Sequence, residues 1–295
     1  MTASRDTIAL AVDADLEASG PPRRRGSVSR AYRAEVRKLA VQRKVQSVFV
    51  LCVVAPILFV AALDAQGSVP MDTLFGQWVH TSGYAVPLCI LGFSGQWALP
   101  ALTSIVAGDI FSAEDRHGTW KTILTRSCSR RQIFIAKALA AVTYSVLAVA
   151  VLALVSLGAG LVLVGRQPII GLSGQLVTSG SAVTLTLASW ATVLPPVPGF
   201  TALGLLLSVA TRNSVVSVGA PAVIGLLMQL GSLLDGPPLI RTLLLATPFG
   251  SWHGLWASDP FYRPVTLGIA VSAAYVVACG TIAYLILRCR GASRS

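Results

Sequence analysis

Charged residues are scarce in this 295-residue sequence. Asp, Glu, Lys and Arg make up 12% of the chain, whereas they make up about 25% of a typical soluble domain. Hydrophobic residues make up 54%, and the mean hydropathy is +0.71. The scarcity of charge excludes an ordinary soluble domain. The repeated long apolar runs indicate instead a protein that crosses a membrane several times.

Several chemical motifs are also missing. The five cysteines are scattered without a C-x-x-C, and their odd number does not favour a disulfide framework. The sequence has no Walker A motif, no H-E-x-x-H, no G-x-S-x-G and no His/Cys cluster with metal spacing. The apolar runs contain almost no ionisable side chains, which ion-driven carriers usually need. We therefore expect no cofactor in this chain, and any energy for transport must come from a partner.

The apolar runs predict an all-α integral membrane protein with about six transmembrane helices, because each run is long enough to cross the hydrocarbon core. The six runs are Ser47–Leu63, Tyr84–Ala107, Ile133–Val164, Ser181–Ala210, Ser214–Leu234 and Val265–Leu287. The third is longer than a span requires, so its first turns should project from the membrane. The fourth contains Pro195, Pro196 and Pro198, which must break or kink the helix. Residues 29–295 are expected to form a single domain.

The residues that flank the first span are polar and basic. Residues 1–28 lack apolar periodicity and are predicted to be a disordered cytosolic tail. In Ser29–Lys44, Tyr32, Val36 and Leu39 share one helical face, which predicts an amphipathic helix in the membrane interface. The alternative is an ordinary basic flank of the first span.

The segment between the fifth and sixth spans, Asp235–Pro264, is too apolar for a free loop and too interrupted for a span. It predicts an external re-entrant helical hairpin with Trp252 and Trp256 as interfacial anchors. The alternative is an aromatic-rich loop.

The distribution of basic residues predicts the orientation. With the N-terminus inside, only Arg166, Arg241 and Arg263 of the 23 Lys and Arg residues lie outside. The positive-inside rule then places both termini in the cytoplasm of a multi-pass protein of the plasma membrane. This topology also accounts for the net charge of +11, so the charge does not indicate binding to nucleic acid.

The densest group of charges lies between the second and third spans, in Gly108–Lys137. Charge of this density must lie outside the hydrocarbon core. After a break at Gly118-Thr119, Trp120, Ile123 and Leu124 have the i, i+3, i+4 spacing of one helical face. Ser129 and Gln132 then form a capping box that opens the next helix. This pattern favours a short helix that docks another protein, or else an amphipathic loop that rests on lipid head groups.

These residues resemble a known family. The pattern Glu114-x-x-x-Gly118-Thr119, with Ile123-Leu124, Ser129-Arg130 and Lys137, is similar to the first cytosolic loop of ABC-2-type transporter permeases. In that family, this loop is the coupling helix, which sits in a groove of a separate ATP-binding subunit. Ser29–Lys44 resembles the family's N-terminal connecting helix, and Asp235–Pro264 resembles its external re-entrant helices. The family often has proline where this chain has Ser127, which is a departure in the loop's turn.

The resemblance implies a set of residues that couple the chain to the ATPase: Glu114, Arg116, Gly118, Thr119, Trp120, Ile123, Leu124, Arg130 and Lys137. Glu114 and Arg116 would contact the ATPase, and Gly118-Thr119 would set the turn. Trp120, Ile123 and Leu124 would insert into it. Arg130 and Lys137 would tie the loop to the third helix.

The resemblance also implies partners and a cargo. The partners are an ATP-binding subunit that holds ATP and Mg, a second permease copy or a paralogue, and the lipid bilayer. The cargo would be an exported amphiphile such as a drug, a peptide antibiotic or a lipid-linked molecule.

Two other functions are compatible with the sequence. Asp109, Glu114, Asp115 and His117 could belong to a membrane-embedded enzyme that modifies lipids. A non-transporting immunity or sensor subunit that still docks an ATPase is the third possibility.

Overall fold

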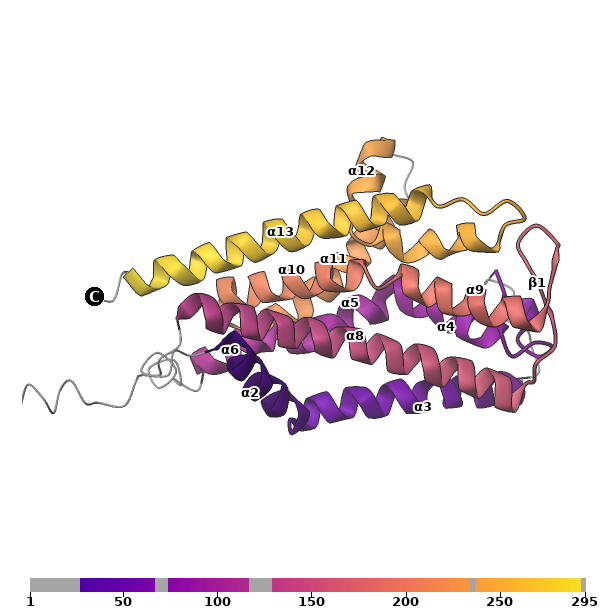
Figure 1. Cartoon of the computed structure of the whole chain (residues 1–295), viewed down its shortest axis with the longest axis horizontal. Helices are drawn as coiled ribbons and strands as arrows, with labels where there is room; N and C mark the ends of the chain where they lie inside the picture. The colour runs from indigo at the N-terminus through magenta and orange to yellow at the C-terminus, as the bar shows by residue number, and fades with distance from the viewer. Residues whose placement is uncertain (1–26, 67–73, 117–128, 234–236, 293–295) are drawn as a thin grey trace, which may run out of the picture.

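The computed structural model describes residues 27–66, 74–116, 129–233 and 237–292. These residues form an elongated bundle of helices that run along one axis (Figure 1). Within these described residues, six helical segments are long and apolar enough to cross a membrane, which confirms the predicted all-α integral membrane fold. They are Arg43–Ala65, Ala85–Glu114, Arg130–Leu163, Ser179–Thr211, Ser214–Ser232 and Arg263–Cys289.

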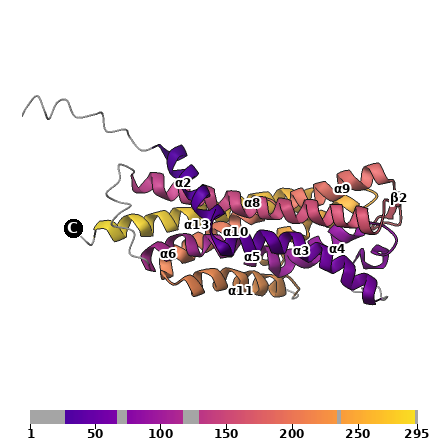
Figure 2. The same cartoon turned by 90° about the horizontal axis from the view of Figure 1, so that it is seen from below.

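The described part of the chain starts with two helices that form an elbow (Figures 1 and 2). These are α2 (Val28–Ala40) and α3 (Arg43–Gln66), separated by Val41 and Gln42. The predicted helix to Lys44 is therefore too long by four residues, since α3 already begins at Arg43. The apolar face of α2 packs on α8 (Arg130–Leu163), so it contacts protein rather than lipid.

The second span is assembled from consecutive short helices. After the turn η1 (Gly76–Trp78), these are α4 (Ala85–Phe93), the π-helical turn η2 (Ser94–Ala98), α5 (Leu99–Ala107) and α6 (Asp109–Arg116). The π-helical turn ends two residues before Pro100, which lacks an N–H and crowds the carbonyl of Gln96, four residues earlier and within this turn. α6 carries the helix beyond Ala107, so the first charges of Gly108–Lys137 lie on a continuation of this span.

The third span is α8, which has 34 residues. The predicted capping box is present, because the Ser129 side chain accepts from the Gln132 N–H and the Gln132 side chain accepts from the Ser129 N–H. At the far end, the antiparallel strands β1 (Ile169–Ile170) and β2 (Leu176–Val177) form a small hairpin, with Ile169 opposite Val177.

The proline cluster interrupts the fourth span as predicted. α9 (Ser179–Thr192) ends before it, and α10 (Pro196–Thr211) begins within it. A two-residue turn then leads into α11 (Ser214–Leu233), with Arg212 in the left-handed conformation at φ 56°. Asn213 caps α11, because its side-chain oxygen accepts from the N–H of Val215.

The fifth and sixth spans are joined by α12 (Pro238–Leu243) and η3 (Thr247–Trp256), and α13 (Arg263–Ala292) is the sixth span. Trp252 and Trp256 are 2% and 0% exposed, so the prediction that they anchor the chain in the interface is wrong. Trp256 packs on Phe75, with ring centroids 5.1 Å apart, and its indole N–H donates to Ser189 Oγ at 2.9 Å. Residues distant in sequence cover both rings.

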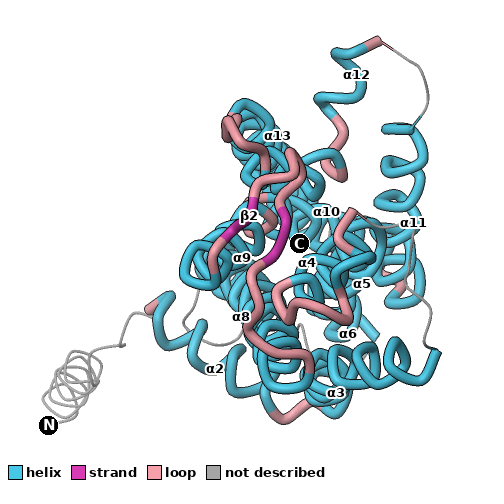
Figure 3. Tube along the Cα trace, turned by 90° about the vertical axis from the view of Figure 1, so that its right-hand side faces the viewer, coloured by secondary structure: helices cyan, strands magenta, loops and turns pink. Residues whose placement is uncertain are grey.

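The helices α8 and α10 form the centre of the bundle. α8 contacts α2, α3, α4, α5 and α10, and α10 contacts α5, α11 and α13. α3 and α11 lie at the periphery in the end-on view (Figure 3). We call the end that holds α2, α6 and the start of α8 the charged end, and the end that holds η1, the β-hairpin and η3 the aromatic end. The last residues of α13 lie at the charged end (Figure 1).

Candidate functional site

The charged end contains a fully buried lysine. Lys137 lies in the second turn of α8, and its side chain has no exposed surface. Its ammonium group donates to Glu114 Oε1 on α6 at 2.6 Å and to Glu35 Oε1 on α2 at 2.9 Å. One cation therefore joins three helices that are distant in sequence. A buried ammonium group requires such partners, since desolvation of an unpaired charge is very costly.

A second lysine completes this group. Lys38 on α2 donates to the same Glu114 oxygen at 3.0 Å. Glu114 is itself 2% exposed, so its carboxylate faces the interior of the chain rather than its surface. The two acids and two lysines are formally neutral together, which allows them to lie between apolar helices. We call Glu35, Lys38, Glu114 and Lys137 the four-residue network.

A separate ion pair ties the α2–α3 elbow to the second span. Lys44 pairs with Asp109 at the start of α6, and the Ser214 hydroxyl of α11 donates to the same carboxylate. Asp109 thus connects α3, α6 and α11. The network and this pair together join five of the helices that meet at the charged end.

Backbone contacts fix α6 against its other neighbours. The Ser208 hydroxyl of α10 accepts from the backbone N–H groups of Phe111 and Ser112. A Cβ atom at Gly108 would lie 2.3 Å from the carbonyl oxygen of Ser217 on α11. Only glycine allows this approach, so the junction between α5 and α6 is packed directly on the α11 backbone.

Aromatic rings line the other side of Lys137. Its ammonium group lies 5.7 Å from the centroid of the Phe111 ring, which stacks on Phe134. Phe134 in turn contacts Tyr284 of α13. The rings exclude water on this side and add a cation–π attraction, so the lysine is held by both charge and packing.

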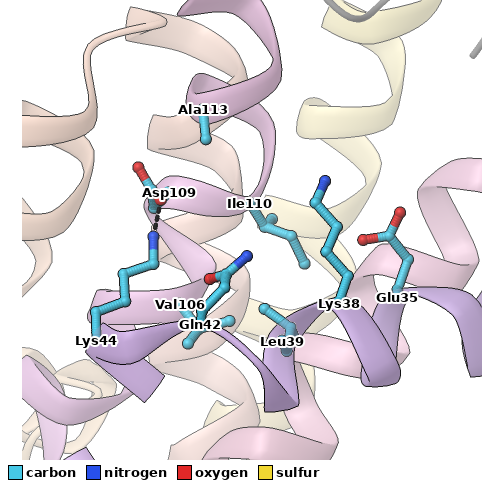
Figure 4. A pocket seen from close by; sticks show the side chains of 9 residues that line it. All are labelled: Glu35, Lys38, Leu39, Gln42, Lys44, Val106, Asp109, Ile110 and Ala113. Carbon is cyan, nitrogen blue, oxygen red and sulfur yellow. Dashed lines mark ion pairs between the residues drawn. The ribbon is translucent and has the colours of Figure 1, made fainter. Parts of the chain in front are cut away.

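A small crevice with a volume of about 20 Å³, room for about one water molecule, lies between the elbow and α6 (Figure 4). Its walls are Glu35, Lys38, Leu39, Gln42, Lys44, Val106, Asp109, Ile110 and Ala113. Drug-sized ligands occupy pockets of about 300–1,000 Å³. The crevice is therefore too small to be the path of a large amphiphile.

The structure describes part of the coupling set predicted from the sequence. Glu114 and Lys137 meet in the network, and Arg130 is the half-buried first residue of α8. Arg116 ends α6, and its side chain lies outside the described residues. Gly118, Thr119, Trp120, Ile123 and Leu124 also lie outside them. The contacts of this set with an ATPase stay predictions.

Sequence reasoning missed the acid on α2. Glu35 is the single acid in the otherwise basic stretch Ser29–Lys44, and Lys137 is the single charge within the six apolar runs, near the start of the third. Each is an isolated exception to its surroundings, and this is the signal that could have paired them. The sequence around Lys38, Lys44 and Ser214 contains no such exception, so it gave no sign that these residues form ion pairs or hydrogen bonds here.

The group of acids considered for a lipid-modifying enzyme is divided in the structure. Asp109 pairs with Lys44, whereas Glu114 pairs with Lys38 and Lys137. Among the described residues, no three His, Cys, Asp or Glu side chains are grouped so that they could hold a metal ion. His117 lies outside the described residues.

The comparisons with known proteins agree with the resemblance noted from the sequence. None of the curated proteins matches the chain. A family described as "ABC-2 family transporter protein" matches residues 32–228, which run from α2 to α11 and contain the whole network. The segment between α11 and α13, and α13 itself, lie beyond the match. Because two thirds of the chain is covered, the protein belongs to the ABC-2 transporter family and is a membrane permease of an ABC transporter.

Proposed function

We propose that this chain is the permease subunit of an ATP-driven exporter whose energy comes from a separate ATP-binding subunit that holds ATP and Mg. The observation that carries the proposal is the pair Lys137–Glu114. It joins α6 and α8, the two helices that flank residues 117–128, and Glu35 extends the connection to α2. A force applied to the segment between Arg116 and Ser129 would therefore reach three helices together.

In this proposal, residues 117–128 contain the coupling helix, with Trp120, Ile123 and Leu124 as its apolar anchors. Helix-in-groove binding derives its affinity from such anchors and its register from flanking charges. Closure of the ATPase subunits would tilt the helices as rigid bodies. Glu114 would then position the coupling segment from inside the chain, because its carboxylate is directed at two lysines.

Co-purification and ATPase measurements test this proposal. The wild-type chain, expressed with its candidate ATP-binding subunit, should retain that subunit in mild detergent. Leu124→Asp should abolish both retention and transport while the protein stays in the membrane. The control is Leu176→Asp, an exposed residue of β2 at the opposite end, which should leave both unchanged. Normal transport by Leu124→Asp would contradict the proposal.

A second permease copy is proposed at the face between α3 and α11. Gln96 in the π-helical turn is exposed in the middle of the second span, between Phe93 and Trp97, which are 57% and 46% exposed. A side-chain amide that faces hydrocarbon lacks the hydrogen bonds it would have in water or protein. A second copy related by twofold symmetry would place its own Gln96 opposite this one. The two side-chain amides could then hydrogen-bond to each other.

Cysteine cross-linking tests the second copy. Trp97→Cys should give a disulfide-linked dimer in membranes under mild oxidation. Leu154→Cys, at a position on α8 that is 61% exposed, should stay monomeric. Cross-linking at position 154 but not at 97 would place the partner on another face.

The substrate class and the orientation belong to the same proposal. Between their ends, the described spans carry apolar, hydroxyl and amide side chains. This composition favours an uncharged amphiphile over a small ion as the transported substrate. The basic residues at the charged end favour a cytoplasmic location for both termini in the plasma membrane. Stimulation of ATPase activity by an amphiphile would distinguish an exporter from a non-transporting immunity or sensor subunit.

A further inference from the structure

We propose that the outer face of α2 binds the anionic phospholipid head groups of the cytoplasmic leaflet. Three exposed arginines, Arg30, Arg33 and Arg37, lie on this face, because the spacing i, i+3, i+7 brings residues to one side of a helix. We call them the basic stripe. Among the described residues, no acid forms an ion pair with any of the three. Positive charge gathered on one face attracts a negatively charged surface.

The single acid of α2 is turned away from the basic stripe. Glu35 accepts a hydrogen bond from the buried Lys137 at 2.9 Å. On the same side of the helix, Tyr32, Val36 and Leu39 pack against the hydrophobic core. Because α8 covers this apolar side, α2 cannot insert it into lipid. Charge is therefore the attraction through which its outer face can bind a membrane surface.

The basic stripe lies close to the start of the first span. α2 ends at Ala40, and the span begins at Arg43, which is also exposed. Between them, Val41 follows Arg37 by four residues and is 75% exposed. α2 lies at the edge of the bundle (Figures 2 and 3), and its main contacts are with α8 and α3. Basic residues clustered directly on the cytoplasmic side of a transmembrane helix are typical of anionic-lipid recognition.

The chemistry and the direction of the stripe favour lipid over the ATP-binding subunit. A guanidinium group can donate two parallel hydrogen bonds to phosphate oxygens, and its aliphatic stem can lie along apolar surface. The proposed coupling segment follows α6, and α6 meets α2 where Lys38 donates to Glu114. Lys38 lies about a quarter of a turn or more from the stripe around the helix. The side of α2 nearest to the coupling segment therefore does not carry the stripe.

This inference rests on the proposed cytoplasmic location of the charged end only in naming the leaflet. Bound head groups would hold the outer side of α2, while Lys137 holds its inner side through Glu35. The binding requires neither the ATPase nor a transported substrate. It can therefore be measured on this chain alone.

Native mass spectrometry of the full-length protein, released from mild-detergent micelles without an ATPase, tests the inference. The probes are dioleoyl phosphatidylglycerol and dioleoyl phosphatidylcholine. A head group that meets two arginines should give about 25-fold more retention of phosphatidylglycerol, since each basic residue near an anionic surface contributes about fivefold. Raising the ionic strength from about 0.1 M to about 1 M before release should weaken this preference, because the Debye length falls from about 10 Å to about 3 Å.

A pair of double variants locates the site. Arg33→Gln with Arg37→Gln should abolish the preference for phosphatidylglycerol. Arg131→Gln with Arg288→Gln is the matched control, because it removes the same charge from exposed positions at the same end of the bundle. It should keep the preference.

Four results would overturn the inference. Equal retention of the two lipids by the wild-type protein would mean that the stripe is only solvated. Loss of the preference in both double variants would mean that net charge, not the stripe, attracts the lipid. A preference that survives Arg33→Gln with Arg37→Gln would place the lipid elsewhere. If that variant instead loses the co-purified ATP-binding subunit and keeps the lipid preference, the stripe docks protein.

The wild-type lipid series and its salt dependence decide the first result even if a variant fails to fold. The outcome is also separate from the export proposal. Loss of lipid preference with normal retention of the ATP-binding subunit would leave that proposal intact. Normal transport by Leu124→Asp would contradict the export proposal and leave the lipid measurement unchanged.

Discussion

The two ends of the bundle are held together in different ways. At the charged end, the helices are joined by ion pairs around Lys137 and Asp109. At the aromatic end, they are joined by the rings of Phe75, Trp252 and Trp256. Ring packing is short-ranged and tolerates no gap, whereas a lysine can exchange one carboxylate for another. The charged end is therefore suited to a joint that changes its partners, and the aromatic end to one that stays closed.

Stability alone does not explain the network. Replacing a buried ion pair by apolar residues is often neutral or stabilising, whereas removal of one partner costs about 3–5 kcal/mol. We infer that the network specifies which helices move together, since Lys137 contacts acids on two different helices.

The largest effect is expected from Lys137→Met, which leaves Glu114 and Glu35 buried without the cation between them. The free energy of unfolding should fall by about 3–5 kcal/mol, and ATPase coupling should be lost. Thermal unfolding in detergent and stimulated ATPase activity measure the two effects. Arg131→Met, an exposed position on the same helix, should change stability by less than about 0.5 kcal/mol.

The double variant Lys137→Met with Glu114→Gln separates charge from packing. It should recover part of the lost stability, because fewer unpaired charges remain, but it should not recover coupling. If both single variants unfold like the wild type, the network does not hold the charged end together.

A somewhat smaller effect is expected from Gly108→Ala. The new Cβ atom would lie 2.3 Å from the Ser217 carbonyl oxygen, so α6 must move away from α11. Such overpacking costs about 1–3 kcal/mol. Gly158→Ala on α8 is the control, because nothing lies within 4 Å of its Cβ position. Equal melting temperatures for the two variants would show that this contact is not tight.

A pair of tryptophan variants tests the aromatic end. Trp256→Phe removes an indole N–H that donates to Ser189, whereas the equally buried Trp190 has an indole N–H without a partner among the described residues. Trp256→Phe should therefore lower the free energy of unfolding by about 1 kcal/mol more than Trp190→Phe does. Thermal unfolding of both variants checks this order. The reverse order would mean that ring volume, not the hydrogen bond, matters at this end.

The smallest effect concerns pH. Burial lowers the pKa of His253, which packs on Trp252 at the aromatic end. The folded protein therefore favours the neutral imidazole, and this contribution to stability is complete above the unfolded pKa of about 6.5 and is lost as the pH falls. The melting temperature should drop between pH 7.5 and pH 5.5, and it should drop less in His253→Gln. An identical pH dependence in both proteins would contradict the assignment.

The sequence predicted what depends on local pattern. The six spans follow from long apolar runs, the break in the fourth from Pro195, Pro196 and Pro198, and the start of α8 from Ser129 and Gln132. Each of these signals lies within a few residues of the structure it determines.

The arrangement of the candidate site could not be predicted in the same way. Glu35 and Lys137 are 102 positions apart, so their contact depends on how α2 packs on α8. The acids of α6 were expected to lie in an exposed charged segment. Asp109 and Glu114 are buried instead, because lysines from other helices neutralise them. For the same reason, Trp252 and Trp256 were misplaced, since their covering residues come from elsewhere in the chain.

The tight turn between α10 and α11 has a mechanical consequence. Only Arg212 and Asn213 separate the two helices, and Arg212 already occupies a left-handed conformation. A connection of two residues is too short to let α11 slide along α10 independently. Any change in the tilt of α11 must be passed directly to α10 and, through it, to α13, so these three spans behave as one lever.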